Sequence, residues 1–179
     1  MNILAVSDTH CLHEEFKMED FKDVDMIIHS GDFANARSPS MNSHEAHHFL
    51  KWYNELPIRY KVLCGGNHDT SIQAKLVNPR HYEKIEYLEH ETKTIGGIKI
   101  FGSPYTKSFG VGWAFNVPEH RTDEYWKEIQ EGTDIVITHG PPKTILDLSY
   151  NLDMQLEYCG DKSLLNHIKR VNPSYHIFG

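Results

Sequence analysis

The chain has 179 residues, which is enough for one hydrophobic core and too few for two ordinary domains, so we predict a single domain over residues 1–179. Its 39% hydrophobic and 24% charged residues, without repeats or low-complexity tracts, exclude a disordered chain. A formal net charge of −7 with no Lys/Arg run argues against long nucleic acid as a partner, whereas a small phosphate ester bound through metal ions remains compatible.

The N-terminus and the cysteines favour a soluble, cytoplasmic protein. The opening run Met1–Val6 has neither the basic flank and length of a signal peptide nor the length of a membrane span, so no membrane partner is expected. Three cysteines without CxxC spacing, Cys11, Cys64 and Cys159, suit free thiols in a reducing compartment. The sequence does not indicate an oligomeric state.

Short apolar runs that end in polar or glycine residues are the main signal along the chain. Their lack of alternation is typical of strands buried on both faces. The runs are Ile3–Val6, Met26–Ile28, Tyr60–Cys64 and Ile135–Ile137.

A helix is predicted between the second and third of these strands. Asn42, with Glu45 three residues later, resembles an N-cap arrangement, and Pro57 ends the segment. Its apolar face at helical spacing consists of Phe49, Trp52, Tyr53 and Leu56.

The rest of the chain predicts a hairpin, two more helices and a last strand. Gly96-Gly97 between two apolar runs indicates the hairpin turn. The segments are Glu91–Ile95 with Ile98–Phe101, the helices Asp123–Glu131 and Asp161–Val171, and the strand Tyr175–Phe178. Together these elements predict an α/β (α+β sandwich) fold of mixed β-sheets flanked by helices.

Candidate chemistry follows the predicted buried strands. Asp8, Asp32, Asn67 and His139 each come just after one of them. Because such strand ends converge on one crevice of an open sheet, these side chains are expected to become neighbours. His10 lies two residues after Asp8 and is therefore able to reach the same ion. Carboxylate and imidazole ligands suit Zn, Mn or Fe(II), and an asparagine amide adds a neutral oxygen.

Taken together and in this order, the motifs indicate a metal site more strongly than any one of them does alone. The segment Gly65–Asp69 combines a Gly-Gly turn with a ligand and a potential proton donor, His68, while Asp69 could either orient His68 or cap a following helix. The sequence closely resembles the calcineurin-like metallophosphoesterases, in particular the small metallophosphoesterase-domain, class III cyclic nucleotide phosphodiesterase-like proteins. The resemblance includes Ser30–Phe33, Trp52–Pro57, Ile100–Thr106 and Thr138–Pro142.

The resemblance implies the calcineurin-like metallophosphoesterase fold and two divalent ions, which could be Mn, Fe, Zn, Co or Ni. It implies that Asp8 and His10 bind the first ion, that Asp32 bridges both, and that Asn67 and His139 bind the second. His68 would be the general acid, and a bridging hydroxide the nucleophile. The expected substrates are small phosphodiesters or phosphomonoesters, with cyclic nucleotides among them.

The chain departs from the resembled family after its final strand. A Gly-His-x-His element normally completes both metal sites there, and this sequence reads His176-Ile177-Phe178-Gly179, with the strand and glycine but neither histidine. A truncated chain, a natural short form, or positions filled by water or a partner chain would each account for this. The alternative function is therefore a catalytically impaired nucleotide- or phosphate-binding module.

Several other residues have plainer explanations. The histidines of the predicted helix lie largely off its apolar stripe, which indicates a solvated face, and His176 is expected to be structural. Arg37 and Arg80 are not assigned to the site. The aromatic residues between Ser103 and Pro118 could stack on a base or anchor a long loop. The helix histidines are His44, His47 and His48, and the loop aromatics are Tyr105, Phe109, Trp113 and Phe115.

Overall fold

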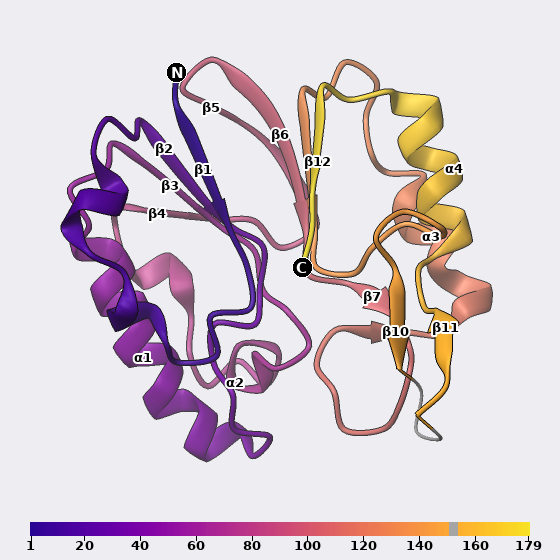
Figure 1. Cartoon of the computed structure of the whole chain (residues 1–179), viewed down its shortest axis with the longest axis horizontal. Coiled ribbons are helices and arrows are strands. Elements are labelled where there is room, and N and C mark those ends of the chain that lie inside the picture. Colours follow the sequence, from indigo (N-terminus) through magenta and orange to yellow (C-terminus); the bar gives the residue numbers. More distant parts are fainter. Residues whose placement is uncertain (151–153) are drawn as a thin grey trace.

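The computed structural model describes residues 1–150 and 154–179 and contains two packed β-sheets with helices on their outer faces (Figure 1). The first sheet has the order β1-β2-β3-β4, and all its pairings are parallel. Its strands are β1 (Ile3–Val6), β2 (Met26–His29), β3 (Tyr60–Leu63) and β4 (Ile85–Tyr87).

The second sheet has the order β12-β9-β6-β5 and is mixed, since only β5 and β6 are antiparallel. Gly96 and Gly97 form the turn of that hairpin with φ of 58° and 84°, a conformation that glycine adopts at little cost. The strands are β5 (Glu91–Ile95), β6 (Ile98–Ser103), β9 (Ile135–Thr138) and β12 (Tyr175–Ile177).

Two further two-stranded ribbons extend beyond the second sheet (Figure 1). One pairs β7 (Thr106–Lys107) with β8 (Asn116–Val117) in parallel, and the other pairs β10 (Leu148–Tyr150) with β11 (Leu156–Tyr158) antiparallel. The α-helices are α1 (Pro39–Glu55), α2 (Thr70–Gln73), α3 (Thr122–Trp126) and α4 (Lys162–Val171). Short 3-10 helices lie at His13–Glu15, Met18–Phe21, Pro79–His81 and Glu119–Arg121.

Three hydrophobic clusters hold the layers together. Because successive strand residues point to opposite faces, Ile27 packs with α1 in one cluster, while Met26 and Ile28 meet Ile137 of the second sheet in another. The third cluster, which includes Phe101 and Trp126, joins the second sheet to α3 and α4. The α/β sandwich predicted from the sequence is confirmed.

The start of α1 differs from the prediction. The helix begins at Pro39 with Ser38 as N-cap, so Asn42 lies within the first turns and is fully buried. Its Nδ2 donates 2.8 Å hydrogen bonds to the carbonyls of Ala36 and His68, and its Oδ1 accepts from Ser71. Asn42 therefore joins α1 to the loop after β3, because tertiary partners satisfy the polar groups that suggested a cap.

The helix predicted over Asp123–Glu131 is shorter than expected. Helix α3 ends at Trp126, and the chain continues in turns to the buried Ile129. Both predicted apolar residues, Trp126 and Ile129, are thus buried, although the regular helix includes only Trp126. No helix in the described part of the chain is both long and apolar enough to cross a lipid bilayer.

Candidate metal centre

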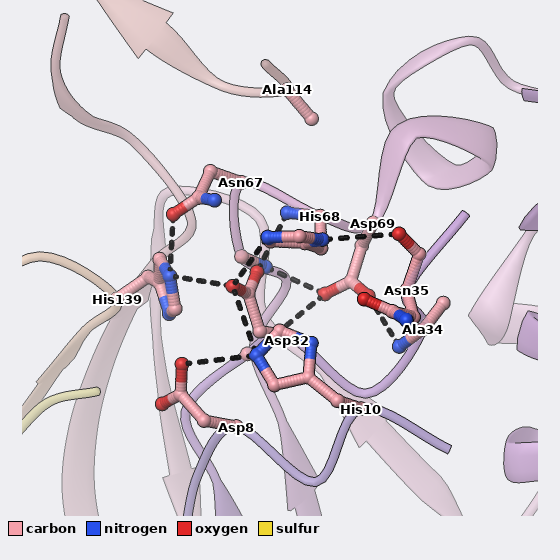
Figure 2. A network of polar contacts seen from close by, with 12 residues as sticks. Asp8, His10, Asp32, Ala34, Asn35, Asn67, His68, Asp69, Ala114 and His139 are labelled. Atoms are coloured by element: carbon pink, nitrogen blue, oxygen red, sulfur yellow. Dashed lines mark hydrogen bonds and ion pairs between the residues drawn. The ribbon is translucent and has the colours of Figure 1, made fainter. Parts of the chain in front are cut away.

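The predicted site residues come together on the loops that follow four strands (Figure 2). Asp8 and His10 follow β1, Asp32 follows β2, and Asn67 follows β3, all in the first sheet; His139 follows β9 in the second. The two packed sheets therefore contribute to a single centre, as expected for carboxyl ends of parallel strands.

The first two of these loops hold each other in an unusual conformation. The backbone N–H of Asp8 donates to the carbonyl of Gly31, and that of His10 donates to Asp32, both at 3.0 Å. Asp8, His10 and Asp32 have φ of 52°, 40° and 57°, which is rare for residues with a side chain. Such strained positions cluster at functional sites, where the surrounding contacts maintain them.

Gly66 allows the loop after β3 to approach the site closely. A Cβ added there would lie 2.3 Å from Oδ1 of Asp32 and 2.8 Å from Nδ1 of His139. Any side chain at this position would displace one of the two candidate ligands, so the close approach explains the glycine.

Oδ2 of Asp32 lies at the centre of three imidazole rings. It is 3.9 Å from Nε2 of His10, 4.0 Å from Nε2 of His68 and 3.4 Å from Nε2 of His139. These separations exceed the usual 2.7–3.2 Å of a hydrogen bond. Three ring nitrogens thus face one buried carboxylate oxygen without hydrogen bonding to it. This arrangement leaves room for cations between the rings and the carboxylate.

Two groups of described residues have ligand atoms close enough to hold an ion. One group is His10, Asp32 and His68, and the other is Asp8, Asp32 and His139; in each, the ligand atoms lie within 4.8 Å of one another. Asp32 belongs to both, which is what a bridging carboxylate requires. The groups pair the remaining residues differently from the resemblance, which assigns Asp8 with His10 and excludes His68 from the ligands.

His139 has the contacts expected of a metal-binding histidine. Its Nδ1 lies 3.1 Å from the carbonyl of Ser30, and its Nε2 lies 2.8 Å from Oδ1 of Asn67. Both contacts need a proton on the ring. Burial lowers the pKa of His139, but the close, negatively charged carboxylate of Asp32 outweighs this and raises it to about 9. A proton thus occupies the place between Nε2 and the oxygens of Asp32 and Asn67 that a cation would take.

His68 is oriented by the backbone. Its amide N–H donates to Oδ1 of Asp32 at 2.7 Å, and its Nδ1 lies 3.1 Å from the carbonyl of Asn35. Because a carbonyl only accepts, Nδ1 carries a proton and Nε2 faces the site.

Asp69 has a role that neither sequence interpretation anticipated. This fully buried carboxylate accepts backbone N–H bonds from Asp32 at 3.0 Å, Ala34 at 3.1 Å and Gly66 at 2.7 Å. Burial, with the charge of Asp32, raises the pKa of Asp69, and the N–H donors oppose that rise. Asp69 thereby fastens the loop after β2 to the loop after β3. It neither contacts the ring of His68 by a hydrogen bond nor caps α2 through its side chain.

His29 supports the site from within the core. Its Nδ1 accepts the N–H of Gly31 at 3.2 Å, and its Nε2 lies 3.1 Å from the hydroxyl of Thr9. Burial lowers the pKa of His29 to about 3, so the ring is neutral at ordinary pH.

A cleft of about 600 Å³ opens beside Asn67 and His139. Lys107, Phe109 and Tyr150 line it, between the β7–β8 loop and the β10–β11 ribbon. This volume accommodates a small organic molecule.

The aromatic loop between β7 and β8 divides into buried and exposed parts. Phe115 is buried in the first cluster and Tyr105 packs against it, so these two anchor the loop. Phe109 is 55% exposed at the cleft, and the ring of Trp113 lies 4.6 Å from that of His68. The anchoring interpretation thus holds for Tyr105 and Phe115, and stacking of Phe109 or Trp113 on a base stays a prediction.

The residues set aside in the sequence are not among the candidate ligands, although Arg37 lies beside the site. His44, His47 and His48 are exposed on α1, and the side chain of His176 meets the hydroxyl of Thr138 at 2.9 Å. Arg80 pairs with Glu91, while Arg37 stacks on Trp113 at 4.0 Å. All three cysteines are free thiols.

Comparisons with known proteins bear on the family and the fold of the chain. The chain is 35% identical over 202 aligned residues to human metallophosphoesterase domain-containing protein 1, covering 98% of this chain and 59% of that protein. It is 34% identical to a probable rhamnogalacturonate lyase C of Emericella nidulans over 84% of this chain and 14% of that protein. A solved structure with 15% identity aligns at a TM-score of 0.71, covering 99% of this chain and 82% of the other, and supports the fold.

The chain thus spans about three fifths of the length of the human relative. The family model of the calcineurin-like phosphoesterases matches residues 1–179, the entire sequence. The chain belongs to the calcineurin-like phosphoesterase family.

Proposed function

We propose that the chain hydrolyses small phosphodiesters or phosphomonoesters with two divalent metal ions. The observation that carries the proposal is the convergence of His10, His68 and His139 on one oxygen of Asp32, at 3.4–4.0 Å. Metal-dependent hydrolysis of phosphate esters is the chemistry that membership of the family implies. The residues present fit such ions, since they offer carboxylate, imidazole and amide donors around one buried carboxylate.

In this proposal Asp8 and His10 hold the first ion, Asn67 and His139 the second, and Asp32 both. When bound, Mn, Fe, Zn, Co or Ni ions would polarise the phosphoryl group and lower the pKa of the attacking water. Asp32 would neutralise part of their charge. The carbonyl of Ser30 would fix the ring of His139 through Nδ1–H, leaving Nε2 to the ion.

His68 donates the proton to the departing oxygen. Since Nδ1–H is held by the carbonyl of Asn35, the donated proton is the one on Nε2, and the ring must carry both protons beforehand. The electron pair of the breaking P–O bond takes this proton, so no free alkoxide forms. The remainder of the ester lies in the 600 Å³ cleft, whose size favours small substrates and whose lining includes both Lys107 and Glu157.

The test is Mn-dependent hydrolysis of diphenyl phosphate, with metal content measured on the same samples. Asp32→Asn should lose most metal and most activity. His68→Ala should keep its metal and lose about 10²–10⁴-fold in kcat, the usual contribution of a general acid. His44→Ala, an exposed histidine on α1, is the matched control and should behave as the wild type. If the wild type binds metal and phosphate without turnover, the binding-module alternative replaces the enzyme.

A further inference from the structure

Besides the 4.0 Å approach of its Nε2 to Oδ2 of Asp32, the ring of His68 has two aromatic neighbours and one polar contact within hydrogen-bond distance. The ring of His10 meets it at 4.7 Å with an interplanar angle of 82°, and the ring of Trp113 at 4.6 Å with 54°. The polar contact is the one between Nδ1 and the carbonyl of Asn35. Of the partners His10, Asn35 and Trp113, only Trp113 comes from the loop between β7 and β8.

Contacts with the loop after β2 and the loop after β3 hold Trp113 in place. The guanidinium of Arg37, from the loop after β2, lies 4.0 Å from the centroid of the indole ring. The following residue, Ala114, donates its N–H to the carbonyl of Asn67 at 2.9 Å, next to His68 in the chain. Phe115 is buried in the core. The loop that carries Trp113 is thus fastened to the segment that carries the proton donor.

We propose that Trp113 is a positioning residue for His68. The inference rests on the proposed role of His68 as general acid. One hydrogen bond at Nδ1 leaves the imidazole free to swing about that contact. The indole, whose ring lies 4.6 Å from the imidazole, restricts this motion and so keeps Nε2 directed at the departing oxygen. A general acid displaced by about 1 Å loses much of its effect, since proton transfer needs hydrogen-bond distance in the transition state.

The reaction step makes this role measurable. The attacking oxygen bonds to phosphorus, the bond from phosphorus to the leaving oxygen breaks, and that oxygen takes the proton from Nε2. Phenolate from diphenyl phosphate is basic and needs the proton. p-Nitrophenolate from bis(p-nitrophenyl) phosphate spreads its charge over the nitro group and departs largely without one. A misplaced His68 therefore slows the first ester far more than the second.

The experiment compares both esters on Trp113→Leu, Trp113→Phe and Val111→Ala. Val111 lies on the same loop and is 97% exposed, so its substitution controls for loop disturbance. Trp113→Leu should lower kcat for diphenyl phosphate about 10–100-fold and for the nitrophenyl ester less than about threefold. Trp113→Phe should recover most of the loss because it keeps an aromatic ring beside His68. Metal content should be equal in all three variants.

A second readout does not depend on turnover. In the metal-free protein, the NMR signals of the His68 ring protons, identified by their loss in His68→Ala, should shift in Trp113→Leu and stay in place in Val111→Ala. Equal slowing of both esters, or unmoved His68 signals, overturns the positioning role. If the wild type binds metal and hydrolyses neither ester, the proposed function fails; shifted His68 signals then still support the indole's hold on the ring, and unmoved signals overturn it.

Discussion

Replacing Asp69 by asparagine should weaken both the fold and the metal centre. The carboxylate accepts two N–H groups on Oδ2, from Asp32 and Gly66, and one on Oδ1, from Ala34. An asparagine side chain has only one acceptor oxygen. In its more favourable orientation this oxygen accepts the N–H groups of Asp32 and Gly66, and the side-chain NH₂ then faces the N–H of Ala34. Leaving one buried N–H unpaired costs about 1–3 kcal/mol, and the two remaining bonds lose the help of the negative charge.

We therefore expect Asp69→Asn to lower the free energy of unfolding by about 2–4 kcal/mol, measured by guanidinium denaturation of the metal-free protein. The loop that carries Asp32 loses its anchor, so Mn affinity, measured by calorimetry, should fall about 10–100-fold, as when outer partners of metal ligands are removed.

Asp161→Asn is the matched control. Asp161 is also a buried carboxylate; it accepts bonds from Ser163, Leu164 and Trp126, on the far side of the second sheet. This variant should lose comparable stability and keep its Mn affinity within about twofold, because its partners support no candidate ligand. Wild-type Mn affinity in Asp69→Asn, or an equal loss of affinity in both variants, would mean that Asp69 does not support the metal centre.

The bridging position of Asp32, the close approach of Gly66 and the buried ring of His29 can each be tested by substitution. Asp32→Asn should remove most bound metal in elemental analysis, and unchanged content would rule out Asp32 as the bridge. Gly66→Ala should reduce metal affinity, since its Cβ would fall 2.3 Å from Asp32; wild-type affinity by calorimetry would contradict the close approach. The pKa of His29 is about 3 in the folded protein and 6.5 in the unfolded chain. The contribution of His29 to the stability of the fold is therefore fully present above pH 6.5 and is lost as the pH falls toward 3. Between pH 7 and pH 5, the free energy of unfolding should fall by about 2 kcal/mol less in His29→Gln than in the wild type. An equal fall in both proteins would exclude His29 as the group responsible.

The strands and the residues that follow them could be predicted from the sequence. Buried parallel strands such as β2 and β9 are uninterrupted apolar runs, and a polar residue after each run necessarily lies at one edge of its sheet. That reasoning brought Asp32 and His139 together from positions 107 residues apart. Each of these strands extends one residue beyond its apolar run, because the polar residue that closes it, His29 or Thr138, is buried as well.

The supporting contacts could not be predicted in the same way. Asn42 has the spacing of a helix cap, yet its amide bonds His68, 26 residues away. Asp69 accepts from Asp32 and Ala34, 37 and 35 residues away, and Trp113 meets His68 from another loop. Such roles depend on which loops become neighbours in the fold, and a single sequence contains no local pattern for them.

Anomalous diffraction from crystals of the wild-type chain grown with Mn tests the two-ion centre most directly. We expect two peaks about 3.5–4 Å apart, with Asp32 between them, His10 at one and His139 at the other. A single peak, or peaks that do not contact Asp32, would contradict the two-ion centre.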